Sequence, residues 1–292
     1  MTDYLLALLL GVIEGLTEFL PVSSTAHLRI SEALLGMDLG NGYWKMFSIV
    51  IQLGAILCLP IYFRKRIADF VSTFPHGPRG DKSVWDHPLT LTFIAFLCTA
   101  VPAFLLTKVI GKHLESLVIM GTSLVVGGII MWIVDALYER KVIPLRTPDV
   151  QDMSVGQAIW VGLCQITSAV FPGTSRSMST IAAGQLAGMS RSAALEFSFF
   201  VSIPTMVAAT CYDLLKSMRP SKTTGLPIGA APSNPHEWIT LAIGFVVSFI
   251  VAYFVVAWFM RWVRTRGFVP FAIYRIIVGT AVLIWALRGA AA

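Results

Sequence analysis

The sequence predicts an all-α polytopic membrane protein, an inverted-topology repeat with six full transmembrane helices and two broken re-entrant helix pairs. Hydrophobic residues make up 56% of the 292 positions, charged residues only 13%, and mean hydropathy is +0.75, values far from those of a soluble domain. Apolar runs of about 20 residues are long enough to cross a bilayer core. They occur at 43–63, 89–110, 117–137, 193–215, 237–260 and 269–288.

Two further apolar stretches, 4–35 and 155–190, are each interrupted near the middle by proline and a cluster of hydroxyl residues. Backbone that leaves the helical conformation at membrane depth is tolerated only where it is buried in protein or lines a wet cavity. Each stretch is therefore expected to be a re-entrant helix pair rather than a complete span.

An internal repeat divides the single membrane domain into two halves, 1–146 and 147–292. A shift of 151 positions places Gly11, Glu14, Pro21 and Ser24 on Gly162, Gln165, Pro172 and Ser175. Each half holds one broken segment and three spans. Because the number of crossings per half is odd, the second half inserts in the opposite membrane orientation to the first. Broken helices of inverted repeats meet near the bilayer midplane. We therefore expect the tip at 21–27 to lie against the tip at 172–180.

The net charge of +6 is explained by membrane topology rather than by nucleic acid, which is not an expected partner. Basic residues gather at span ends, as at 64–66 and 261–266. The positive-inside rule then places the loop after 63 and the loops 138–154 and 261–268 in the cytoplasm, with both termini outside. The four cysteines stand singly in apolar segments without a metal-binding spacing, and they are interpreted as packing residues.

The segment that leads into the first tip reads GVIEGLTEFLPVSSTAH, and its ionisable groups indicate function because such groups are expensive inside a membrane. Glu14 and Glu18 are four residues apart and share one helix face. Magnesium typically takes one or two carboxylates together with substrate phosphates. His27 can act as an acid or base, and Ser23 or Ser24 as a nucleophile. Singly, a histidine can bond to backbone and a serine can cap a helix, but together they favour a catalytic site.

The second tip reads PGTSRSMST, a composition that suits an oxyanion. A Pro-Gly break exposes backbone N–H groups, and the following helix directs its positive N-terminus at a bound anion. Arg176 adds a planar fork that matches phosphate oxygens. Small hydroxyl residues also allow close helix packing, an alternative that stays open for the hydroxyls but not for a buried arginine. The expected substrate-binding residues of the two tips are Ser23, Thr25, Gly173, Thr174, Ser175 and Ser177.

Both motifs resemble those of the bacterial undecaprenyl-diphosphate phosphatases of the bacitracin-resistance type. EGLTEFLPVSSTAH resembles the glutamate-rich signature of that family and PGTSRSMST its second signature, and the likeness in length, spacing and hydropathy extends over the whole chain. The resemblance implies a multi-pass inner-membrane hydrolase that removes the terminal phosphate of the C55 lipid diphosphate. It further implies regeneration of the monophosphate carrier for peptidoglycan synthesis and a divalent cation, Mg²⁺ or Ca²⁺.

Carried over by position, the resemblance implies that the catalytic residues are Glu14, Glu18, Ser24, His27 and Arg176, the two glutamates being also the metal ligands. Attack by Ser24 with His27 accepting its proton, attack by a water that His27 activates, and replacement of Ser24 by Ser23 all stay open. We expect the active site to be reached from the outer, periplasmic side. The lipid diphosphate and membrane lipid are the expected partners, and a homodimer is compatible with the sequence.

The leading alternative function is an inverted-repeat transporter or flippase of a phosphorylated lipid or small anion, because midplane anion sites are typical of secondary transporters. A carrier needs a binding site but neither a nucleophile nor a base. A structural subunit is a weaker third hypothesis, since it leaves both polar tips unexplained.

Overall fold

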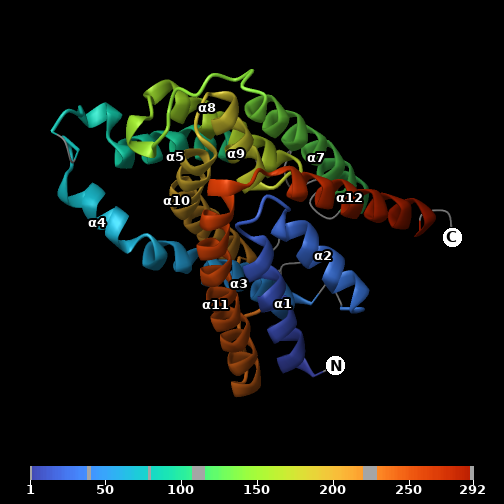
Figure 1. Ribbon diagram of the computed structural model, residues 1–292. Helices are drawn as coiled ribbons and strands as arrows, with labels where there is room; N and C mark the ends of the chain where they lie inside the picture. The colour runs from blue at the N-terminus through green and yellow to red at the C-terminus, as the bar shows by residue number, and fades with distance from the viewer. Residues whose placement is uncertain (1, 38–40, 78–79, 107–115, 220–228, 290–292) are drawn as a thin grey trace.

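The computed structural model describes residues 2–37, 41–77, 80–106, 116–219 and 229–289, which form helices and no strand (Figure 1). Six helices in these ranges are long and apolar enough to cross a membrane. They are α3 (Gly42–Tyr62), α5 (Pro88–Leu105), α7 (Leu117–Glu139), α10 (Arg191–Ser217), α11 (Pro235–Thr265) and α12 (Val269–Gly289). The predicted all-α polytopic fold is confirmed. The last part of the predicted span 89–110 lies outside the described residues.

Each broken segment is a pair of helices joined by a short turn. The first pair is α1 (Asp3–Thr17) and α2 (Ser24–Leu34), and the second is α8 (Val155–Val170) and α9 (Arg176–Leu186). In both pairs a serine with positive φ caps the second helix, Ser23 at 74° and Ser175 at 73°. Left-handed backbone is uncommon outside glycine, so the two turns share one specific conformation.

The helix bounds correct the alignment of the two tips. α2 and α9 begin and end 152 positions apart, at Ser24 and Arg176 and at Leu34 and Leu186, whereas the sequence pattern pairs Ser24 with Ser175 at 151. The physical reason is that the second turn has one more residue between its proline and the capping serine: Pro21 precedes Ser23 by two positions, and Pro172 precedes Ser175 by three. Ser23 is therefore the counterpart of Ser175, and Ser24 and Arg176 are the first residues of equivalent helices.

The first helix of each half packs against the second span of the other half. A Cβ added to Gly11 of α1 would lie 2.8 Å from the Gly244 carbonyl oxygen in α11, and one added to Gly162 of α8 would collide with the Ala95 carbonyl oxygen in α5. Small residues allow helices to approach this closely in membranes. The reciprocal packing is what a two-fold relation between the halves would give, while their insertion from opposite faces stays a prediction.

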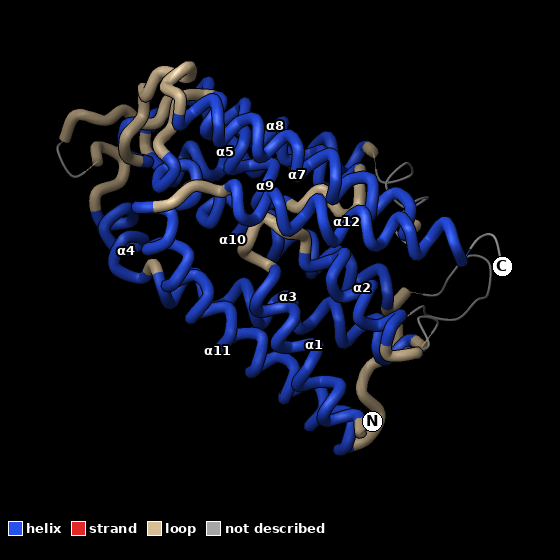
Figure 2. Tube along the Cα trace, turned by 45° about the vertical axis from the view of Figure 1, so that its right-hand side comes forward, coloured by secondary structure: helices blue, strands red, loops and turns tan. Residues whose placement is uncertain are grey.

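The third spans of the two halves, α7 and α12, pack along each other and lie side by side in both views (Figures 1 and 2). A Cβ on Gly121 of α7 would lie 3.0 Å from the Gly279 carbonyl oxygen of α12. This contact holds α12 across the ends of both re-entrant pairs, where Tyr274 and Arg275 reach the two tips.

Short helices complete the described chain: α4 (Arg64–Ser72) and the 3₁₀ turns η1 (Val84–Asp86) and η2 (Val150–Asp152). Arg66 of α4 forms ion pairs of 2.7 Å with Asp149 and 2.9 Å with Glu196. The carboxylates beside it raise the pKa of Arg66 above its ordinary value even though burial opposes this. The cluster fastens α4 to the start of α10.

An aromatic cluster in the core supports the turn that follows α1. The Phe19 and Phe199 rings meet edge to face at 5.4 Å, and Phe63 and Phe200 lie 5.2 Å apart. Edge-to-face aromatic pairs add to the free energy gained by burial. Because Phe19 is fully buried, the neighbouring Glu18 and Leu20 are held in place beside the second tip.

Candidate active site

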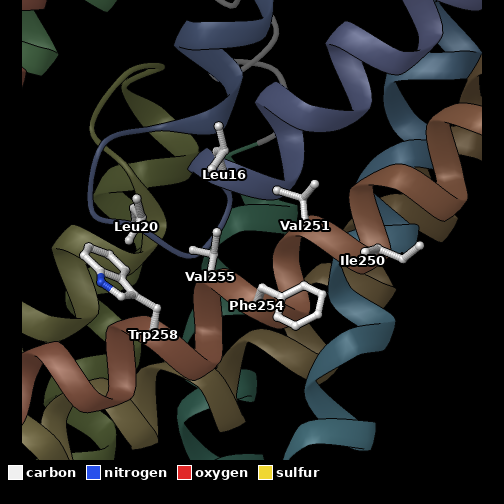
Figure 3. Close-up of a pocket in the computed structure, with 7 residues that line it drawn as sticks. All are labelled: Leu16, Leu20, Ile250, Val251, Phe254, Val255 and Trp258. Carbon is white, nitrogen blue, oxygen red and sulfur yellow. The ribbon is translucent and has the colours of Figure 1, made fainter.

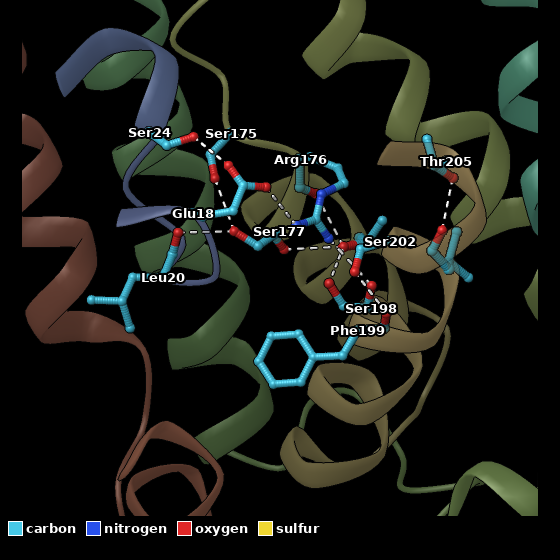
Figure 4. A network of polar contacts seen from close by, with 12 residues as sticks. Glu18, Leu20, Ser24, Ser175, Arg176, Ser177, Ser198, Phe199, Ser202 and Thr205 are labelled. Carbon is cyan, nitrogen blue, oxygen red and sulfur yellow. Dashed lines mark hydrogen bonds and ion pairs between the residues drawn. The ribbon is translucent and has the colours of Figure 1, made fainter. Parts of the chain in front are cut away.

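The two tips lie against each other in the structure (Figure 4). The Ser177 hydroxyl of the second tip donates to the carbonyl of Leu20 in the first at 2.9 Å. Arg176 donates from Nη2 to Glu18 Oε1 at 3.2 Å. Residues more than 150 positions apart in the chain therefore contribute to one polar cluster, as the repeat predicts.

Glu18 is the centre of this cluster. Its Oε2 accepts a 2.5 Å hydrogen bond from the Ser24 hydroxyl, and its Oε1 accepts from Arg176. The Glu18 and Arg176 side chains are only 4% and 9% exposed. Removing one partner of a buried ion pair costs much folding free energy, and hydrogen bonds to an ionised carboxylate are short and strong. Glu18 is thus placed to hold Arg176 and to withdraw a proton from Ser24.

Arg176 retains hydrogen-bonding capacity for a ligand. Its Nη1 donates to the Ser198 carbonyl at 3.3 Å, whereas Nε is buried and has no partner. The guanidinium carbon also lies 5.9 Å from the centre of the Phe19 ring. A buried donor without a partner is rare in folded proteins and requires an explanation. An anionic oxygen of a ligand would provide the missing partner.

The hydroxyl residues of the two tips differ in position. Ser175 and Ser177 are buried, with their oxygens 3.0 Å apart. Gly173 has φ +93°, and its carbonyl accepts from Arg275, so it shapes the turn. Thr25 is exposed, and neither it nor the half-buried Thr174 has a side-chain hydrogen bond to the described residues of this cluster.

The His27 side chain makes no hydrogen bond with Ser24. Its Nδ1 lies 2.8 Å from the Ser23 carbonyl oxygen and its Nε2 lies 2.7 Å from the Tyr274 hydroxyl, with the two rings stacked. Both ring nitrogens are engaged, and the Ser24 hydroxyl is directed at Glu18 instead. The structure therefore does not bring His27 and Ser24 together as a direct base and nucleophile, and Ser23 serves as the cap of α2.

Glu14 is the most isolated polar group of the site. It is fully buried, both of its carboxylate oxygens lack a hydrogen-bond partner, and it lies within electrostatic range of Glu18 and Glu32. A buried carboxylate of this kind needs a proton or a cation. Among the described residues no group of three or more His, Cys, Asp or Glu side chains could hold a metal ion alone. With oxygens from substrate phosphates, Glu14 and Glu18 would suit a divalent cation, and this cation stays a prediction.

Arg275 of α12 is a site residue that the sequence analysis missed. It is fully buried, and it donates to the carbonyls of Pro21 at 2.9 Å and of Gly173 and Ser123 at 3.1 Å. It therefore ties the first tip, the second tip and α7 together. The available signal was an arginine in the middle of the apolar run 269–288, since an intramembrane charge indicates function.

The fold and the site define a class: a polytopic membrane protein with a buried Ser–Glu–Arg cluster suited to an anionic group. The chain belongs to the bacitracin resistance protein BacA family, whose model matches residues 7–281. The family resemblance predicted from the two motifs is thereby confirmed.

Individual relatives agree with this assignment. The chain is 72% identical over 288 residues to the undecaprenyl-diphosphatase of Koribacter versatilis. The aligned region covers 99% of this chain and 100% of that protein. It is 39% identical to the undecaprenyl-diphosphatase of Caldanaerobacter subterraneus over 95% of this chain and 94% of that protein. The undecaprenyl-diphosphatase of Rhizobium johnstonii is also 39% identical, over 98% of both chains.

Proposed function

We propose that this protein hydrolyses undecaprenyl diphosphate to undecaprenyl phosphate and inorganic phosphate, and so recycles the lipid carrier used in peptidoglycan synthesis. The observation that carries the proposal is the contact of Glu18 with both the Ser24 hydroxyl and the Arg176 guanidinium. Membership of the BacA family and relatives named undecaprenyl-diphosphatase support it. A transporter or flippase would need no hydroxyl held on a carboxylate, so this pair favours the enzyme.

The diphosphate binds where the two tips meet. Arg176 offers its unpartnered Nε, and the Ser175 and Ser177 hydroxyls lie beside it. The N-termini of α2 and α9 supply positive ends of helix dipoles and free backbone N–H groups, which favour phosphate. These groups hold the distal phosphate against Ser24, the first residue of α2.

The reaction is a phosphoryl transfer, in which catalysis consists mainly of positioning and charge stabilisation. Glu18 Oε2 takes the proton of Ser24, and Ser24 Oγ forms a bond to the distal phosphorus. The bond from that phosphorus to the bridging oxygen breaks, and undecaprenyl phosphate leaves. Water then hydrolyses the phosphoserine and releases inorganic phosphate. Arg176 stabilises the charge on the phosphate oxygens in both steps.

His27 acts as a positioning residue in this scheme, because its contacts fix the start of α2 to Tyr274 of α12. Glu14 and Glu18 would hold Mg²⁺ or Ca²⁺. When bound, the cation would neutralise charge on the phosphate oxygens.

The protein is a multi-pass membrane protein, and we place it in the bacterial inner membrane with its site open to the periplasmic side. The distribution of basic residues among the loops supports this orientation. The lipid diphosphate is its substrate and the surrounding membrane lipid its environment.

Phosphate release by the purified protein in detergent tests the reaction class. Detergent micelles enclose no second compartment, so a carrier would produce no signal in this assay. Wild-type protein should release phosphate from undecaprenyl diphosphate and lose this activity when a chelator is added, with recovery on adding Mg²⁺ or Ca²⁺. No release under any metal condition would favour a carrier. Full activity in the presence of the chelator would refute the role of the cation, but the proposed hydrolysis would stand.

A further inference from the structure

An apolar groove lies beside the candidate active site, between the end of α1 with the turn that follows it and just over two turns of α11 (Figure 3). Its volume is about 510 Å³, and every side chain that lines it is apolar. Leu16 and Leu20 form one wall, and Ile250, Phe254 and Trp258 lie along the other. From Ile250 to Trp258 the helix rises about 12 Å. The groove is therefore an elongated hydrocarbon-binding surface.

The groove is continuous with the polar cluster through Leu20. The Leu20 side chain lines the groove next to Trp258 (Figure 3), while its backbone carbonyl accepts the hydrogen bond from Ser177. Glu18, two residues earlier, contacts Ser24 and Arg176. One end of the groove thus adjoins the groups proposed to hold the diphosphate, and the other end leads away along α11.

The pairing of a polar end with an apolar length is complementary to an amphiphile that has an anionic head and a hydrocarbon tail. Leu16, Phe254 and Trp258 are 43%, 67% and 45% exposed, so the groove is open to a chain arriving from the membrane. Within a bilayer the tail is already out of water, and any gain must come from packing against a shaped surface. A concave wall provides that packing, which a convex helix face does not.

We propose that this groove binds the isoprenoid units nearest the diphosphate of the substrate, so that the enzyme recognises the tail as well as the head group. The inference rests on the proposed function and adds a tail-binding subsite to it. Leu20 and Trp258 contact the first unit, and Leu16, four residues before Leu20 in the last turn of α1, contacts units further from the phosphate.

The test compares Leu16→Trp with Leu8→Trp. Both leucines are on α1 and are similarly exposed, at 43% and 45%, but Leu8 does not line the groove. In detergent, Leu16→Trp should raise the KM for undecaprenyl diphosphate about fivefold with kcat unchanged, corresponding to about 1 kcal/mol. Leu8→Trp should leave both constants unchanged. Dimethylallyl diphosphate, with one isoprenoid unit, serves as a competing ligand that is too short to reach Leu16. Its inhibition constant should therefore be the same in the wild-type protein, Leu16→Trp and Leu8→Trp.

A second pair of variants keeps the test decisive if Leu16→Trp does not fold. Trp258→Ala removes part of the wall and should also raise the KM, whereas Trp238→Ala, on α11 but outside the groove, should not. An unchanged KM in Trp258→Ala and in folded Leu16→Trp would mean that ordinary membrane lipid fills the groove, and would overturn the inference. So would equal effects in the controls. Absence of phosphate release by the wild-type protein would refute the proposed function instead, and the groove would lose its ligand with it.

Discussion

Replacing Arg275 should disrupt the active site without removing any group that contacts substrate. Its guanidinium makes three hydrogen bonds of 2.9 to 3.1 Å to carbonyls of Pro21, Gly173 and Ser123. Hydrogen bonds from a charged group contribute about 1.5 to 3 kcal/mol each. Their combined loss exceeds the 1.4 kcal/mol that changes a population tenfold, so few molecules of Arg275→Met would keep both tips in place.

A misplacement of about 1 Å can lower the rate about 100-fold. We therefore expect Arg275→Met to reduce kcat by about this factor, and Arg275→Lys to be intermediate because one ammonium cannot reach carbonyls that two guanidinium nitrogens serve. Steady-state phosphate release with undecaprenyl diphosphate measures the effect, and size-exclusion chromatography checks the fold. Arg288→Met, at the exposed end of the same helix, is the matched control. A kcat within about threefold of wild type in folded Arg275→Met would refute the positioning role.

Three further predictions concern the head-group site and the topology. Arg176→Lys should lower kcat/KM about 100-fold, as the loss of one donor from a preorganised oxyanion site does; near-normal turnover at matched protein level would exclude the clamp. Glu14→Gln and Glu18→Gln should fold but respond less to added Mg²⁺ or Ca²⁺ in a metal titration, because amides are poorer ligands for hard cations, and unchanged activation in both would reassign the pair. In a cysteine-free background, single cysteines in the loops 138–154 and 216–236 should be labelled from opposite sides of the membrane, the latter from outside; labelling of both from one side would refute the inverted insertion.

The spans and the two broken segments could be predicted from the sequence because apolar length and proline position depend only on local order. The register of the tips could not. The one extra residue between Pro172 and Ser175, compared with Pro21 and Ser23, leaves the hydropathy pattern unchanged, but it moves the counterpart of Ser24 from Ser175 to Arg176.

The pairing within the site also depended on tertiary structure. Ser24 and His27 are three residues apart and were expected to act together, but the turn through Pro21 brings the Glu18 carboxylate to the Ser24 hydroxyl. Arg275 was visible as a charge in an apolar span. Its partners are backbone carbonyls from three distant segments, and such contacts have no sequence signature.

The central claim is that Ser24, held on Glu18, attacks the distal phosphorus. Rapid acid quenching of the wild-type enzyme with undecaprenyl diphosphate labelled on that phosphate tests it most directly. Label should appear on the protein in the first turnover, at Ser24 by mass spectrometry of the isolated peptide, and then pass to inorganic phosphate. Glu18→Gln should form this phosphoserine more slowly, and Ser24→Ala should not form it. Release of labelled phosphate by the wild-type enzyme with no protein-bound label at any quench time would contradict the claim and assign the attack to water.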